Sequence, residues 1–151
     1  MDLNCLTQKS QEAIHDAQTK ALRHGHSEID VEHLLLALLE QADGLVPRLL
    51  ERIDVNVDSL RTDAEHALEA RPRVTATGAT GEARVSRALS VLLADAGKEA
   101  ERLKDEYVSV EHLVLAMIKS GSSTAPGRLL SAASAPTGFW RYSRRYAVLS
   151  A

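Results

Sequence analysis

Apolar residues recur at helical spacing through most of the chain, which predicts a largely α-helical fold. The first such segment follows Thr7, a residue type that caps helix N-termini well, and continues through Ala13, Ala17 and Ala21. It stops at Gly25, and glycine suits the left-handed conformation that often ends a helix. The pattern therefore predicts a first helix between Thr7 and Gly25.

A second helix is expected to follow, with Asp30 as its N-cap and Glu32 in the first turn, where the helix dipole favours an anion. The stretch from Leu34 to Leu39 is apolar throughout, so we expect this helix to be buried on most sides. Two more helices are predicted in this half of the chain, Val46 to Arg52 and about Val57 to Ala70. Residues 71–81, which are rich in threonine and glycine, have the composition of a linker.

The chain then repeats itself at an offset of 79 residues. The motif Val-Glu-His-Leu-x-Leu-Ala occupies residues 31–37 and again 110–116, and matched positions extend from Asp16 and Asp95 to Pro47 and Pro126. In the second copy Ser109 stands at the capping position of Asp30, and Glu111 stands at the position of Glu32. A duplicated helical unit of this kind is expected to bury the apolar faces of its two copies against each other.

We therefore predict one all-α domain over residues 1–130, made of two pseudo-symmetric repeats of about four helices each. The first repeat covers residues 1–70 and the second covers residues 82–130, with the linker 71–81 between them. In the second repeat, a long helix is expected to begin near Glu82 and to include Val85, and a short helix is expected from Pro126 to Leu130.

Residues 131–151 break the pattern, because four of the five aromatic residues of the chain and three arginines gather there without an acidic residue. A basic-aromatic segment of this kind can stack on bases or lie on a membrane surface. A disordered end is the simpler explanation. A frameshift in the gene is a third, since synonymous codons for this segment can encode an amphipathic helix in another frame.

Composition narrows the function classes. The net charge of −3 gives no basis for nucleic-acid binding, and no apolar run is long enough for a membrane span. The N-terminus lacks the pattern of a signal peptide, and the single cysteine, Cys5, excludes an internal disulfide. These features predict a cytoplasmic protein that contacts neither nucleic acid nor membrane.

Candidate chemistry is sparse. His24, His26 and His33 lie close enough in sequence to be candidate metal ligands. The spacings that zinc ligands commonly show are absent, however, so solvated histidines are the favoured interpretation. Because His33 and His112 hold matching third positions of a helix, a structural role near the first-turn amides is expected for both. Triads built from Ser27, His33 and Asp30, or from Ser109, His112 and Glu111, are disfavoured because such close neighbours rarely face one another. No P-loop motif occurs, and we predict neither an enzyme nor a cofactor.

The doubled Val-Glu-His-Leu-x-Leu-Ala motif resembles the N-terminal domain of Clp-family AAA+ unfoldases, as do the opening Leu-Thr-Gln-Lys-Ser-Gln-Glu-Ala and the segment Asp-Gly-Leu-Val-Pro-Arg-Leu-Leu. Within this family the chain is most similar to the ClpB disaggregases, over residues 1 to about 130. The resemblance implies two four-helix repeats in one globule. It also implies a substrate-handling role without catalysis, because both nucleotide-binding domains and the middle coiled coil are absent from this sequence.

In ClpB-like domains a shallow apolar groove with polar neighbours engages unfolded or aggregated polypeptide. The resemblance implies that the residues at the matching positions bind peptide; they are Thr7, Leu93, Asp105, Glu111 and His112. His112 stands where some relatives have leucine. Leu92, Leu93 and the run Val31 to Leu39 are equally compatible with a plain core, which is favoured for most of them. The alternative function is a stand-alone regulatory module that binds an adaptor protein, a Clp ring or a small molecule.

Overall fold

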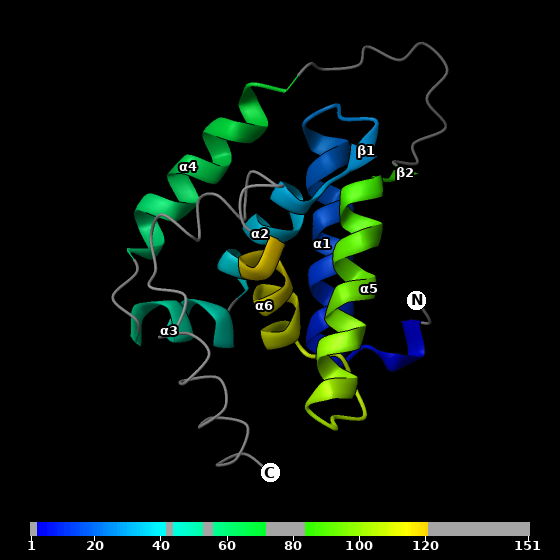
Figure 1. Cartoon of the computed structure of the whole chain (residues 1–151). Coiled ribbons are helices and arrows are strands. Elements are labelled where there is room, and N and C mark those ends of the chain that lie inside the picture. Colours follow the sequence, from blue (N-terminus) through cyan, green and yellow to red (C-terminus); the bar gives the residue numbers. More distant parts are fainter. Residues whose placement is uncertain (1–2, 42–43, 53–55, 72–83, 121–151) are drawn as a thin grey trace.

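The computed structural model describes residues 3–41, 44–52, 56–71 and 84–120, and these residues are mostly helical (Figure 1). They form a 3₁₀ turn, η1 (Leu3–Cys5), and two short strands, β1 (Glu28–Ile29) and β2 (Arg84–Val85). The α-helices are α1 (Gln8–Arg23), α2 (Val31–Glu40), α3 (Leu45–Arg52), α4 (Val57–Glu69), α5 (Arg87–Arg102) and α6 (Val110–Ser120). The predicted all-α class is confirmed. None of these helices is long and apolar enough to cross a bilayer.

The core is centred on α2 and α6, the two helices that carry the repeated motif. Every residue of α2 from Val31 to Leu39 is buried, and so is every residue of α6 from His112 to Met117. Helix α2 packs against α1 and α4, whereas α6 packs against α5 and α3, and α2 also contacts α5 and α6. The prediction of a helix buried on most sides is thus confirmed, and each repeat contributes one such helix to a shared core.

Short strand pairings join each repeat to the other. Ile29 pairs with Val85 in the parallel β1–β2 ladder, and Leu6 forms a parallel bridge with Val108. The offset of 79 residues maps Leu6 onto Val85 and Ile29 onto Val108, so these two pairings are one contact used twice. The segment that precedes the first helix of each repeat therefore pairs with the segment that precedes the second helix of the other repeat.

The capped ends of the helices repeat in the same way. Thr7 caps α1 by accepting the backbone N–H of Ser10, and Ser86 caps α5 by accepting that of Leu89. Past the C-terminal ends of these two helices, Gly25 has φ of 68° and Lys104 has φ of 61°. Glycine adopts this left-handed conformation freely, whereas lysine does so at a cost, so the second repeat keeps the geometry without the residue that suits it.

Two boundaries differ from the sequence-based prediction. Helix α5 begins at Arg87 rather than near Glu82, because Ser86 caps it and Val85 lies in β2 instead of the helix. Arg71, assigned to the linker, contacts the first repeat directly through Asp30 and Glu32. The rest of the linker, the helix predicted from Pro126 to Leu130 and the atypical segment 131–151 lie outside the described residues.

An ion pair also recurs, with its charges exchanged. Lys20 of α1 binds Glu40 of α2, and the matching positions in the second repeat are Glu99 of α5, which binds Lys119 of α6. The duplicated helix pair has therefore retained the contact while both partners changed sign. Such exchange is expected when complementarity between the two charges matters more than the position of either one.

This exchange predicts a compensating double substitution. Lys20→Glu alone places two carboxylates together and should lower the free energy of unfolding by up to about 1 kcal/mol, since the pair is partly exposed. Lys20→Glu combined with Glu40→Lys should recover most of this loss, because the second repeat already uses that arrangement. Urea unfolding of the wild type, both single variants and the double variant measures the coupling. Strictly additive losses would contradict the prediction.

Candidate functional site

Four of the five predicted peptide-binding residues lie around the start of α6. Together with Ser109, which contacts both Glu111 and His112, they form the second-repeat cluster; its members are Thr7, Asp105, Ser109, Glu111 and His112. The backbone N–H of Thr7 donates to the carbonyl oxygen of Val108 at 3.1 Å, which brings the start of α1 beside the start of α6. The exposed ring of Tyr107 adjoins the cluster in the same loop. The starts of α1 and α6 thus meet at the loop that carries this exposed aromatic residue.

His112 holds this cluster together from beneath. Its ring is buried, with Nδ1 2.9 Å from the backbone nitrogen of Ser109 and Nε2 2.9 Å from a carboxylate oxygen of Asp105. Because the backbone N–H of Ser109 can only donate, Nδ1 must accept, and the ring proton is assigned to Nε2, which donates to Asp105. The imidazole therefore orients the Asp105 side chain, whose exposed fraction is 41%.

Glu111 is half-buried in the first turn of α6. Burial raises the pKa of its carboxyl group, and the negative charge of Asp105 raises it further, while His112 and the Ser109 hydroxyl act in the opposite direction. The Ser109 hydroxyl lies 3.4 Å from a carboxylate oxygen of Glu111. Two acidic side chains with different exposure therefore flank Ser109, and the more buried one resists ionisation.

Leu93 stands apart from the other four residues. It lies on α5, is partly buried, and packs against the core. Helix α5 ends at Arg102, and at 1.5 Å per residue Leu93 is roughly 14 Å along the axis from that end. One hollow on the described surface lies along α1 and another lies between α1 and α2, and both are lined mainly by polar residue types; neither includes Leu93 or a residue of the second-repeat cluster.

Ser109, His112 and Asp105 form a chain of contacts that superficially resembles a catalytic triad. The Ser109 hydroxyl oxygen lies 3.0 Å from Nδ1 of His112, whose Nε2 contacts Asp105. The lone pair of Nδ1, however, already accepts the backbone N–H of Ser109, so it cannot serve freely as the base that activates a hydroxyl. The arrangement instead satisfies a buried helix start, which is the structural role expected for this histidine.

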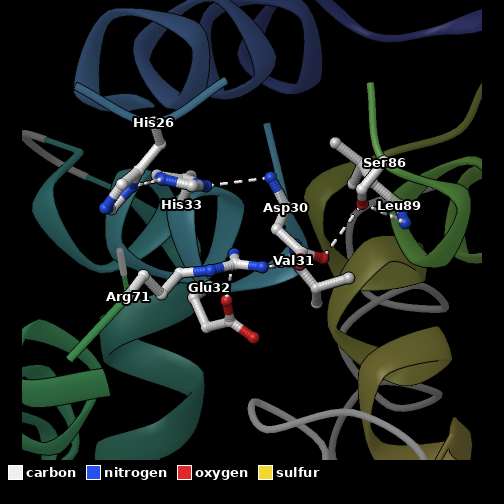
Figure 2. A network of polar contacts seen from close by, with 8 residues as sticks. All are labelled: His26, Asp30, Val31, Glu32, His33, Arg71, Ser86 and Leu89. Atoms are coloured by element: carbon white, nitrogen blue, oxygen red, sulfur yellow. Dashed lines mark hydrogen bonds and ion pairs between the residues drawn. The ribbon is translucent and has the colours of Figure 1, made fainter. Parts of the chain in front are cut away.

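A matching group of side chains lies at the other end of α1 and α5, and Figure 2 shows it closely. We call it the first-repeat cluster; it consists of His26, Asp30, Glu32, His33, Arg71 and Ser86. Asp30 caps α2 by accepting the N–H of Val31, while its own N–H donates to Nδ1 of His33 at 2.8 Å. His33 thus takes the place that glutamate or glutamine usually has in a capping box.

Arg71 closes this cluster from the end of α4. One nitrogen of its guanidinium lies 2.6 Å from Asp30, and another lies 2.7 Å from Glu32 (Figure 2). Burial opposes the charge on Asp30, but the Val31 N–H and Arg71 outweigh it, so the pKa of Asp30 is lowered. Burial likewise disfavours the charged guanidinium, yet Asp30 and Glu32 raise the pKa of Arg71. The ion pairs thus stabilise the charged forms of both Asp30 and Arg71 against the effect of burial.

Two buried histidines complete the first-repeat cluster. Nε2 of His33 lies 2.8 Å from Nδ1 of His26, and the two rings meet edge to face. Because Nδ1 of His33 accepts the N–H of Asp30, its Nε2 carries the proton and donates to His26. Burial, reinforced by His26 and Arg71, lowers the pKa of His33 to about 4. Both rings are thus neutral in the geometry observed.

Sequence reasoning missed part of this arrangement. Solvated side chains were favoured for His26 and His33, but their exposed fractions are 7% and 0%. The second expectation for His33, a structural role near the first-turn amides, is confirmed by its hydrogen bond from the Asp30 N–H. The missing signal was the repeat itself, because the 79-residue offset maps His26 onto Asp105, a residue that was singled out, and each contacts Nε2 of the matching histidine. Arg71 gave no such signal. Among the described residues, no group of three or more His, Cys, Asp or Glu side chains is placed to hold a metal ion.

Comparison with known proteins places the repeat in a family. The model of the Clp repeat (R) N-terminal domain matches residues 5–133. The chain belongs to the Clp repeat N-terminal domain family. Two similar curated relatives are the chaperone protein ClpB of Bacillus cereus, 50% identical over 117 residues, and that of Nitratidesulfovibrio vulgaris, 44% identical over 130 residues. These alignments cover 77% and 85% of this chain but only 14% and 15% of the relatives.

Solved structures share the fold at lower sequence identity. The N-terminal domain of Hsp104 from Candida albicans matches with a TM-score of 0.75 at 19% identity, covering 89% of this chain and 85% of that one. The N-terminal domain of the ClpV1 ATPase from E. coli matches with a TM-score of 0.71 at 25% identity, covering 92% and 77% of the two chains. The pseudo-symmetric pair of clusters is therefore built on the fold of Clp repeat domains.

The buried His33 predicts a specific acid sensitivity. An unfolded histidine titrates near 6.5, whereas the pKa in the fold is about 4, so the unfolded chain binds more protons between these values. The free energy of unfolding should be highest above pH 6.5 and fall as the pH drops towards 4, by up to about 3 kcal/mol from this residue.

His33→Gln isolates this effect, because glutamine can still accept the Asp30 N–H but does not titrate. Urea unfolding from pH 7.5 to 4 should show a flatter dependence for His33→Gln than for the wild type. The control His15→Gln, on the exposed side of α1, should follow the wild-type curve. Parallel curves for all three proteins would rule out the role given to His33.

Proposed function

We propose that the chain binds unfolded or aggregated polypeptide, with Thr7, Asp105, Glu111 and Leu93 as contacts and His112 supporting them from beneath, and that it does so without catalysis. The observation that carries the proposal is the gathering of Thr7, Asp105 and Glu111 around the start of α6, beside the exposed Tyr107. These are positions that match the peptide-binding region of ClpB-like domains. The family membership supports the same conclusion.

The chemistry of the cluster suits an extended chain. A tyrosine ring offers apolar area with a polar tip. Burying apolar surface against a peptide contributes roughly 25 cal/mol of favourable free energy per Å². Asp105 and Glu111 accept hydrogen bonds from backbone amides or basic side chains. His112 is buried, so in this proposal it acts by orienting Asp105 and does not contact the peptide.

The binding is expected to be weak. Ordering an unfolded segment offsets most of the gain from a small apolar contact, so a dissociation constant in the micromolar range is expected. Weak and sequence-tolerant binding suits a module that samples many clients. The clients, and any Clp ATPase subunit or adaptor that the chain contacts, belong to this proposal.

The same polypeptide in two states gives a direct test. Fluorescein-labelled α-lactalbumin, reduced and alkylated with iodoacetamide so that it stays unfolded, should bind and raise its anisotropy. Native α-lactalbumin with the same label should not bind. Equal binding of both forms, or of neither, would contradict the proposal. Binding of one folded adaptor or Clp ring without any affinity for unfolded chains would favour the regulatory alternative.

Leu93→Asp tests whether the contact reaches along α5. We expect it to weaken binding of the unfolded α-lactalbumin at least tenfold, because a carboxylate replaces an apolar contact, while the helical circular dichroism is kept. Val91→Asp is the matched control, since Val91 lies on the same helix with 52% of its surface exposed. Unfolding of Leu93→Asp would show that Leu93 serves the core instead, and equal affinities of the two variants would remove Leu93 from the site.

A further inference from the structure

The two clusters correspond at five positions. Each member of the second-repeat cluster lies 79 positions from a member of the first-repeat cluster, and at both helix starts the backbone N–H of the capping position donates to Nδ1 of the matching histidine. The N–H of Asp30 donates to His33 at 2.8 Å, and the N–H of Ser109 donates to His112 at 2.9 Å. The matched pairs are His26 with Asp105, Asp30 with Ser109, Glu32 with Glu111, His33 with His112, and Ser86 with Thr7.

An exposed apolar side chain lies near each cluster, but at different positions of the repeat, because the offset of 79 residues maps Tyr107 onto Glu28 and Val85 onto the buried Leu6. Tyr107 is exposed beside the second-repeat cluster, and Val85, with 48% of its surface exposed, directly precedes Ser86 in the first. Each cluster therefore combines a helix start, at least one carboxylate and an exposed apolar side chain. The first-repeat cluster therefore contains the same kinds of groups that are proposed to bind polypeptide in the second-repeat cluster.

Arg71 is the difference between them. Its guanidinium reaches both Asp30 and Glu32, at 2.6 Å and 2.7 Å. Within the described part of the chain, no arginine or lysine forms an ion pair with Glu111, the counterpart of Glu32. The carboxylates of the first-repeat cluster are thus shown to accept a guanidinium, and the one they hold belongs to the chain itself.

We propose that the first-repeat cluster is a second polypeptide-binding face, which Arg71 keeps closed by occupying the place of an arginine side chain of a client. This proposal rests on the function proposed for the second-repeat cluster. Because Arg71 follows the end of α4, it competes at a high effective concentration, and an incoming arginine must displace two charge-assisted hydrogen bonds. The occupant expected here is an unfolded segment with an arginine next to an apolar residue.

Removing the guanidinium should open this face. The test uses the whole chain labelled with ¹⁵N and the peptide Gly-Ser-Leu-Arg-Leu-Gly-Ser, with a citrulline-for-arginine peptide as the uncharged probe. In the wild type, the amides of Tyr107 and Val108 should shift on titration, and those of Ile29 and Ser86 should not. In Arg71→Gln both pairs should shift, and the number of peptides bound per chain should rise from one to two. The citrulline peptide should lose the added shifts.

Arg61→Gln is the matched control, because Arg61 lies on α4 and pairs only loosely with Asp58, at 3.9 Å. It should behave as the wild type does. The proposal would be overturned if, in Arg71→Gln, only the amides of Tyr107 and Val108 shifted on titration. It would also be overturned if the citrulline peptide still shifted the amides of Ile29 and Ser86. If Arg71→Gln does not fold, Arg71→Lys serves as the test variant. Lysine should bind Asp30 and Glu32 more weakly than arginine does, so the peptide should partly shift the amides of Ile29 and Ser86. The absence of these shifts would overturn the proposal.

The amides of Tyr107 and Val108 report on the second-repeat cluster, and those of Ile29 and Ser86 report on the first-repeat cluster. A wild type without shifts at Tyr107 and Val108 would refute the function proposed for the second-repeat cluster. If Arg71→Gln then still shifts Ile29 and Ser86, the closed face is real and is the one that binds. If Arg71→Gln shows shifts at neither pair, the closed face is refuted too.

Discussion

The central segments of α2 and α6 are too apolar for any of their faces to lie in water, and this requirement shapes the rest of the molecule. Val31 to Leu39 and His112 to Met117 are buried without interruption. A helix buried all round needs neighbours on every side, which one repeat does not supply. The contacts of α2 with α5 and α6, and of α6 with α3, bring the two copies into one core.

Burying the start of a helix creates a second problem, which the two polar clusters solve. The first amides of a helix have no partner within it, so they need acceptors when water is excluded. His33 and His112 provide one acceptor each, and the strand pairings Ile29–Val85 and Leu6–Val108 fix the segments around them. The same structural solution thus presents carboxylates at both ends of the domain, and Arg71 distinguishes one end from the other.

The fold was largely predictable from the sequence, because the 3.6-residue period and the repeat both report on burial. The caps Thr7 and Asp30 and the left-handed Gly25 were also predictable, since their roles are local. The start of α5 was not, because Val85 continues the apolar pattern while its backbone pairs with Ile29, a residue 56 positions earlier. Nor was the role of Arg71, since an ion pair across some forty residues leaves no periodic trace. The predicted peptide contacts remain proposals.

Native-state hydrogen exchange of the whole chain tests the shared core most directly. If the two repeats bury α2 and α6 together, the central amides of both helices should exchange only through global unfolding, with the same opening free energy and the same dependence on denaturant. Leu35 and Val114, which are both fully buried, are matched positions for this comparison. A lower opening free energy for one of the two helices, with a smaller denaturant dependence, would show that its repeat opens alone and would contradict the account.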